Sequence, residues 1–158
     1  MSTLVIAEAG VNHNGELGLA KDLVVAASEA GADVVKFQTF RAEELATKAA
    51  PKAKYQKKLT QNHQSQQEML RQLQLSEQDH LALHDFCRER NIEFLSTGFD
   101  IASVRFLHKL GLLRLKIPSG DITNLPLLSE IGRKGLPVIM STGMASLDEI
   151  RAALAVLD

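Results

Sequence analysis

The sequence predicts an α/β fold in which about five βα units build a parallel sheet covered by helices. Three observations predict it. Short apolar runs alternate with longer segments whose apolar residues recur three and four positions apart. The apolar runs are continuous, as in strands buried on both faces of a parallel sheet. Helix-start and helix-stop residues fall between them. Two architectures fit this order, an open doubly wound sheet and part of an eight-stranded barrel.

The elements follow in order along the chain. Five apolar runs are expected to be strands: residues 4–7, 34–37, 94–95, 112–117 and 138–140. Five segments have the period of a helix: residues 19–27, 81–87, 104–110, 127–131 and 150–157. Two serines precede helical segments with an acid three residues later, as helix N-caps do: Ser76 with Asp79 and Ser146 with Glu149. Three glycines follow helical segments, where a left-handed residue is wanted: Gly31, Gly111 and Gly135.

Composition bounds the function. The chain has 158 residues, 45% of them hydrophobic and 23% charged, which suits one globular unit with a sizeable core. A formal net charge of -1 argues against a nucleic-acid or membrane-surface protein. The single cysteine, Cys87, excludes a disulfide framework within the chain and is expected to be a small buried hydrophobe. No apolar run approaches the ~20 residues of a membrane span, and the expected compartment is the cytoplasm.

Residues 41–75 interrupt the βα order after the second expected strand. This segment is rich in Gln, Lys and Ala, and five lysines make it locally basic: Lys48, Lys52, Lys54, Lys57 and Lys58. We favour a solvated, partly helical excursion for most of its residues. The alternative is a lid over an anionic ligand, in which Tyr55 would be the most important residue.

Polar residues gather where the expected strands end. They are Glu8; Lys36 and Gln38; Ser96 and Thr97; Lys116, Ser119 and Asp121; and Ser141 and Thr142. Parallel strands all point the same way, so these side chains are expected at one rim, where such folds place their active sites. Because side chains alternate along a strand, Lys36 and Gln38 share a face.

A lysine inside an apolar strand is costly to bury without an anionic partner. One interpretation pairs Lys116 with Glu8 or Asp121 inside the protein. The other, which we favour, is an anion site for a ligand, because two lysines and several hydroxyls share the rim. Such a set suits a small molecule that bears both a phosphate and a carboxylate.

The histidines are candidate metal ligands or site residues. His80 and His84 have the i, i+4 spacing of a metal pair, but their polar neighbours predict a solvated helix face far from the rim. His63 and His108 are expected at the surface. His13 follows the first strand and is expected either at the rim or as a residue that shapes the turn.

Five motifs, in this order and spacing, resemble the sialic acid synthase family, which includes N-acetylneuraminate, legionaminate and pseudaminate synthases. They are IAEAGVNHNG, AGADVVKFQTF, FLSTGFD, LKIPSGDITNLPLL and PVIMSTGMAS. The resemblance implies a (β/α)₈ barrel, of which residues 1–158 would be the N-terminal portion with about five βα units. It also implies condensation of phosphoenolpyruvate with an N-acylated mannosamine-type sugar, with release of phosphate.

The resemblance also assigns roles. Five residues would hold the phosphate and carboxylate of phosphoenolpyruvate: Lys36, Thr97, Lys116, Ser119 and Ser141. Gln38 and Asp121 would meet the amino sugar, and Glu8 would be a candidate base. Asp121 stands where the family commonly has glutamate, so its reach differs. The family's cofactor is a divalent metal, Mn²⁺ or Mg²⁺, whose histidine ligands lie in later strands and not in this chain.

The resemblance covers only part of the family's length, so three of the eight units and any C-terminal antifreeze-like domain would be absent. We therefore expect a truncated product without synthase activity by itself, whose first and fifth strands are unpaired edges. Two alternatives stay open: a non-catalytic half-barrel that serves as an assembly or binding module, and an aldolase that forms a Schiff base through Lys36 or Lys116. The motifs KIPSGDITN and KAKYQKK favour the legionaminate branch, and the family commonly dimerises, so a homo-oligomer is expected.

Overall fold

The computed structural model describes residues 3–46 and 65–158. Their centre is a five-stranded parallel sheet in the order β1-β2-β3-β4-β5. The strands are β1 Ile6–Gly10, β2 Val34–Thr39, β3 Glu93–Gly98, β4 Leu115–Ile117 and β5 Val138–Met140. Within the described residues, β1 and β5 each pair with a single neighbour. The predicted parallel sheet is thus confirmed.

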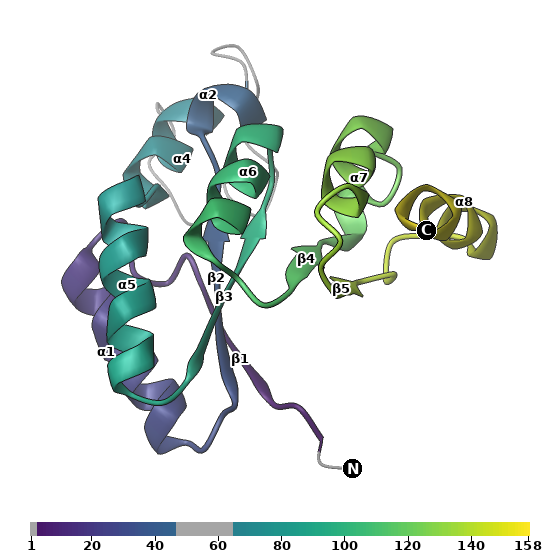
Figure 1. Ribbon diagram of the computed structural model, residues 1–158. Helices are drawn as coiled ribbons and strands as arrows, with labels where there is room; N and C mark the ends of the chain where they lie inside the picture. Colours follow the sequence, from purple (N-terminus) through teal and green to yellow (C-terminus); the bar gives the residue numbers. More distant parts are fainter. Residues whose placement is uncertain (1–2, 47–64) are drawn as a thin grey trace.

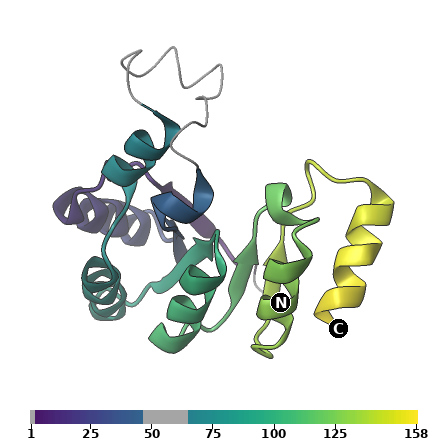
Figure 2. The ribbon, with the colours of Figure 1, turned by 90° about the horizontal axis from the view of Figure 1, so that it is seen from above.

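Helices follow the strands and cover one side of the sheet (Figure 1). They are α1 Leu17–Glu29, α2 Ala42–Leu45, α4 Gln66–Leu73, α5 Glu77–Glu89, α6 Ile101–Leu110, α7 Leu125–Gly132 and α8 Leu147–Leu157, with a 3-10 turn, η1, at Ser119–Asp121. Seen from above, the long helices from α1 to α8 follow one another in an arc outside the curving sheet (Figure 2). None of the described helices is long and apolar enough to cross a membrane.

The strand ends differ from the apolar runs that predict them. β1 begins two residues later than expected and continues to Gly10, and β2 and β3 extend through polar residues at their carboxyl ends. β4 is only three residues long, because residues 112–114 belong to its connection with α6. Ladder hydrogen bonds use the backbone, so a strand can continue past its apolar side chains into the polar rim.

The core forms two clusters on the helix side of the sheet. The larger lies under α1 and α5 and includes Phe37 and Leu83, each 0% exposed. The smaller lies under α7 and α8 and contains Ile117 and Leu128. Each fully buried leucine contributes about 1.5–3 kcal/mol relative to an exposed one, so these clusters hold the helices on the sheet.

Local signals at the helix ends behave as predicted. The capping boxes at Ser76 and Ser146 are confirmed, and Ser65 forms a third with Glu68 before α4. Each of these serine side chains accepts a hydrogen bond from the third helical N–H, which the helix leaves unpaired. The three predicted helix-ending glycines all have positive φ, where L side chains are strained: Gly31, Gly111 and Gly135.

The two described ends of the segment 41–75 pair with each other. The Ala42 N–H donates to Gln74 Oε1 at 3.0 Å, and Gln67 Nε2 donates to the Ala46 carbonyl at 2.8 Å. An ion pair joins Glu43 and Arg71. The described part is thus partly helical, as predicted. The five lysines and Tyr55, like His63, lie outside the described residues.

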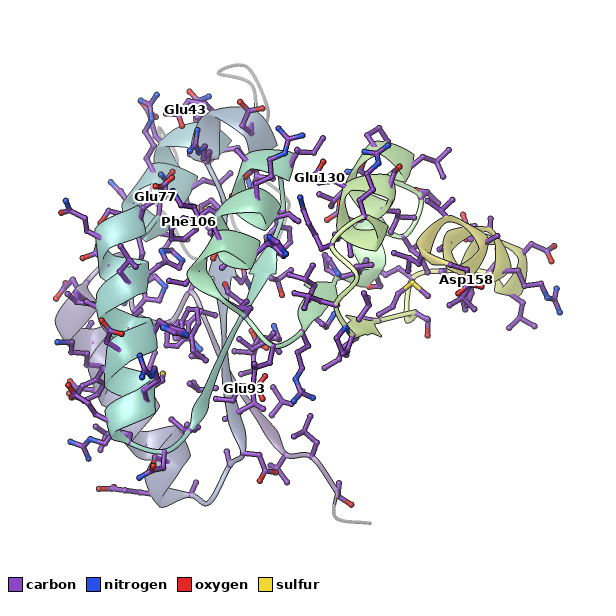
Figure 3. The ribbon with its side chains drawn as sticks, viewed as in Figure 1. Glu43, Glu77, Glu93, Phe106, Glu130 and Asp158 are labelled. Atoms are coloured by element: carbon purple, nitrogen blue, oxygen red, sulfur yellow. The ribbon has the colours of Figure 1, made fainter. Side chains whose placement is uncertain are left out.

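A buried carboxylate fastens α6 to α7. Glu130, which lies between the two helices in Figure 3, accepts two hydrogen bonds from Arg105 at 3.0 Å and pairs with Lys134 at 2.6 Å. The hydrogen bonds from Arg105 are the main cause that lowers the pKa of Glu130 to about 2. Glu130 therefore stays ionised across the physiological range, and its ion pair with Arg105 joins α7 to α6.

Candidate functional site

Lys36 connects the first three strands on the side of the sheet away from the helices. It lies beside Glu8 in the parallel register, and its Nζ is 2.5 Å from Glu8 Oε2. The same Nζ donates to Thr97 Oγ1 at 3.4 Å. The Lys36 side chain is 14% exposed and that of Glu8 is 52% exposed. One cation thus joins an accessible acid to a buried hydroxyl at the rim.

One row of the sheet carries Gln38, Thr97 and Lys116 side by side. Gln38 is paired with Thr97, and Thr97 with Lys116, in the parallel register. Residues in register point to the same face, and Lys36 shares that face with Gln38 because two positions separate them. The predicted gathering of these side chains is therefore present in the structure.

Lys116 reaches across to the fifth strand. Its Nζ donates to Ser141 Oγ at 2.8 Å and to the Ile117 carbonyl at 2.6 Å. Burial lowers the pKa of Lys116, and the charge of Lys36 lowers it further, while Glu8 acts in the opposite direction. Thr97 lies between the two lysines, because it accepts from Lys36 and is paired with Lys116 in the parallel register. This is the arrangement that a dianionic ligand needs.

Gln38 and Glu8 approach each other over Gly10. A Cβ at Gly10 would lie 3.2 Å from Glu8 Oε1 and 3.7 Å from Gln38 Nε2, and Gly10 has a φ of +57°. Glycine at this position leaves space for both polar ends, and it adopts positive φ without strain. The amide of Gln38 therefore belongs to the same cluster as the Glu8 carboxylate.

Ser119 and Asp121 lie in η1 after β4. Asp121 Oδ1 accepts a hydrogen bond from Asn124 Nδ2 at 3.3 Å, and within the described residues no hydrogen bond or ion pair links either residue to the lysine cluster. Their predicted contacts with phosphoenolpyruvate and with the amino sugar stay predictions. Of the predicted site residues, six are grouped by contacts or register: Glu8, Lys36, Gln38, Thr97, Lys116 and Ser141.

The acid at this rim pairs with Lys36 and not with Lys116. An internal ion pair between Lys116 and Glu8 or Asp121 was one interpretation of the sequence, but the hydrogen-bond acceptors of Lys116 in the described residues are a hydroxyl and a carbonyl. Both of these acceptors are neutral. A half-buried ammonium without a carboxylate at hydrogen-bond distance is available for an anionic ligand.

One histidine prediction is wrong. His80 does not lie on a solvated face far from the rim: it is 2% exposed and bonded to Thr39 at the end of β2. It falls on the buried side of α5 with Leu83 and Cys87, and the polar residues around it in the sequence face elsewhere. Its partner in the i, i+4 pair, His84, is partly exposed and packs edge-on against Phe94.

The other predicted histidine and cysteine positions agree with the structure. His13 is fully buried, and its Nδ1 accepts from the Gly15 N–H at 3.0 Å, which confirms that it shapes the turn after β1. His108 is exposed, as expected. Cys87 is buried, and burial raises the pKa of its thiol to about 12.

The described residues do not present a metal centre. Within residues 3–46 and 65–158, no three His, Cys, Asp or Glu side chains gather as metal ligands. What they present is a set of donors: two ammonium groups, two hydroxyls and an amide, with one acid at the edge. Such donors bind and orient an anion, and can stabilise negative charge that develops on a departing group.

The chain is similar to known proteins over almost its whole length. The chain is 55% identical over 154 residues to the N,N'-diacetyllegionaminic acid synthase of Legionella pneumophila and 52% identical over 155 residues to that of Campylobacter jejuni. Each alignment covers 98% of this chain. The chain spans 43% and 46% of the length of these two relatives, respectively.

A solved structure shows the same architecture. The N-acetylneuraminic acid (sialic acid) synthetase of Leptospira borgpetersenii, solved in complex with citrate, matches with a TM-score of 0.86 and 32% identity, over 99% of this chain and 50% of that one. This likeness confirms the predicted part of a (β/α)₈ barrel. The model of the NeuB family matches residues 23–158, and the chain therefore belongs to the NeuB family.

Proposed function

We propose that this chain is the phosphoenolpyruvate-binding portion of a nonulosonic acid synthase, which condenses phosphoenolpyruvate with an N-acylated mannosamine-type sugar and releases phosphate. The observation that carries the proposal is the convergence of Lys36 and Lys116 on one face, joined by Thr97 and extended by Ser141. The names of the relatives, which make acidic sugars, support the same reaction class.

In the proposed reaction the enol carbon of phosphoenolpyruvate forms a bond to the sugar aldehyde carbon. Water adds to the enol-ether carbon, and the bond between that carbon and the phosphate oxygen breaks, releasing inorganic phosphate. Lys36 and Lys116 neutralise the phosphate and carboxylate of the substrate and then the departing phosphate. Thr97 and Ser141 orient it through their hydroxyls.

Glu8 is the proposed proton acceptor, because it is the acid beside this cluster and its side chain is half exposed. Its ion pair with Lys36 keeps the carboxylate in place, so it stands where water or the sugar would arrive. Gln38, which lies next to Glu8 over Gly10, is proposed to hydrogen-bond the amino sugar together with Asp121.

Several parts of the proposal rest on the family resemblance alone. The whole enzyme is proposed to use Mn²⁺ or Mg²⁺, whose histidine ligands the family resemblance places in later strands. The acceptor is proposed to belong to the legionaminate branch, with a homo-oligomeric enzyme in the cytoplasm. Residues 1–158 by themselves are proposed to bind phosphoenolpyruvate without turnover.

Calorimetric titration of the 158-residue chain with phosphoenolpyruvate tests the proposal. We expect saturable binding that Lys36→Met and Lys116→Met each weaken. Lys109→Met, at an exposed position on α6, is the matched control and should bind like the wild type. Wild-type protein that is folded but binds no phosphoenolpyruvate, or equal affinity in all four proteins, would contradict the proposal.

A second candidate function is Schiff-base chemistry at Lys116, favoured by the lowered pKa of this amine. An imine to a carbonyl substrate would be trapped by borohydride as a stable mass increase on Lys116. A chain whose mass is unchanged after borohydride treatment with pyruvate and with an N-acylmannosamine would rule this candidate out.

A further inference from the structure

Three buried polar side chains form a network on the helix side of the sheet. Thr39 Oγ1 lies 2.8 Å from His80 Nε2 and 2.7 Å from Ser96 Oγ. His80 Nδ1 lies 2.8 Å from the carbonyl oxygen of Ser76, the N-cap of α5. All three side chains belong to residues that are buried. The network therefore links β2, β3 and α5 through side chains that are largely shielded from solvent.

The donor and acceptor in each of these hydrogen bonds follow from the Ser76 carbonyl oxygen at one end of the network. A carbonyl oxygen only accepts, so Nδ1 of His80 carries the proton and Nε2 accepts from the Thr39 hydroxyl. Thr39 Oγ1 then accepts from Ser96. Burial is the main cause that lowers the pKa of His80, against the backbone carbonyls of Ser76 and Gln38 and the acids Asp79 and Glu77, which raise it. The neutral ring satisfies each member of the network.

This network occupies the opposite face of the rows that carry the anion site. Thr39 follows Gln38 in β2, and Ser96 precedes Thr97 in β3. In the parallel register Phe37 is paired with Ser96, and Gln38 with Thr97. A slip or rotation of either strand end would break the network on one face and move Gln38 and Thr97 on the other.

Side-chain packing does not fill the space around His80 completely. A cavity of about 280 Å³ borders Thr39, Ser76 and His80, between the starts of α5 and α6. The ring of Phe106, which points from α6 toward α5 in Figure 3, meets the His80 ring edge-on at 5.7 Å between centroids. Because a cavity removes contacts on one side, the hydrogen bonds carry much of the constraint here.

We propose that His80 is a positioning residue for the anion site: by accepting from Thr39 and holding the Ser76 carbonyl, it fixes the carboxyl ends of β2 and β3 and with them Gln38 and Thr97. This inference rests on the proposed function for its effect on phosphoenolpyruvate, but its structural half is independent of any ligand. His80 itself lies on the far face of the sheet from the ligand.

Two variants test the roles of the two ring nitrogens of His80 separately. In His80→Asn the new amide reaches the place of Nδ1 and keeps the bond to Ser76, but the bond to Thr39 is lost. The longer side chain in His80→Gln places its amide near Nε2 and keeps the bond to Thr39. Hydrogen exchange of the 158-residue chain is measured at residues 37–39 and 96–98, with residues 34–35 and 93–94 as the internal control.

We expect faster exchange at 37–39 and 96–98 in His80→Asn, with the control residues unchanged, and near wild-type exchange in His80→Gln. Phosphoenolpyruvate affinity should fall about tenfold in His80→Asn, the equivalent of one lost hydrogen bond, and less than about threefold in His80→Gln. Thr39→Val should reproduce His80→Asn, and the double variant should add little to either.

The outcomes separate the two proposals. Uniform loss of protection along both strands, or equal effects of the Asn and Gln variants, would overturn the positioning role. If the wild type binds phosphoenolpyruvate measurably and His80→Asn binds it equally well despite local loss of protection, the connection between His80 and the anion site would be overturned. Wild-type protein that does not bind phosphoenolpyruvate would contradict the proposed function. The hydrogen-exchange pattern would still decide whether His80 fixes the strand ends.

Discussion

The two faces of the sheet at its carboxyl rim differ in the charge and the burial of their polar side chains. On the inner face, Lys36 and Lys116 are charged and only partly buried; Lys36 contacts Glu8 and Thr97, whereas Lys116 donates only to the neutral Ser141 hydroxyl and Ile117 carbonyl within the described residues. On the outer face, His80, Thr39 and Ser96 are neutral and buried, and each bonds to the next. The difference teaches how a strand end can keep its charged side chains available for a ligand. The polar side chains on its opposite face are fully hydrogen-bonded to one another, and these bonds fix the position of the strand.

The largest expected effect is on the inner face. Lys116→Met should weaken phosphoenolpyruvate binding roughly 30-fold, since a hydrogen bond to a charged group contributes about 2 kcal/mol. Titration calorimetry measures it, and Lys109→Met is the matched control. The free energy of unfolding should hardly fall, because burial disfavours the charge of Lys116 in the folded chain. A large loss of stability with unchanged affinity would reverse the roles of the two faces.

On the outer face the effect should appear first in stability. Ser96→Ala removes the donor to Thr39 and should lower the free energy of unfolding by about 1 kcal/mol. Urea unfolding of the 158-residue chain measures it. Thr123→Ala, at an exposed position after η1, is the control and should change little. A Ser96→Ala protein as stable as the wild type would show that the network is dispensable.

A smaller effect concerns the acid at the edge of the inner face. Glu8→Gln releases Lys36 from its ion pair and removes a negative charge next to the anion site. Binding of inorganic phosphate at low ionic strength should tighten about threefold, within the range of an exposed ion pair. Glu29→Gln, at an exposed position in the last turn of α1, is the control. Weaker phosphate binding in Glu8→Gln would mean that Glu8 orders Lys36 for the ligand.

The smallest effect near neutral pH is the titration of His80. Its pKa in the folded chain is lowered from the ordinary value of 6.5, mainly by burial, so the unfolded chain binds the proton more readily. Stability from this group is therefore full above pH 6.5 and declines as the pH falls below it. Urea unfolding from about pH 7 down to about pH 5 should show a shallower decline in His80→Gln than in the wild type. Identical slopes would contradict a buried, neutral His80.

Local patterns in the chain were enough to predict much of the site. Apolar runs and helix caps predict the order of the elements, and polar residues after the strands predict the rim that holds Lys36, Gln38, Thr97, Lys116 and Ser141. These inferences succeed because side-chain alternation and parallel direction are local properties of each βα unit. The strand ends were the least accurate part, because backbone pairing continues past the apolar side chains.

The sequence by itself determined which residues reach the rim and which face of a strand they share. Only the tertiary structure decided which side chains contact each other. Glu8 pairs with Lys36, Lys116 bonds to Ser141, and His80 is buried against Thr39. The physical reason is distance along the chain. The partners are separated by 25 to 41 residues, so their contact depends on strand register and helix packing, which no local pattern specifies.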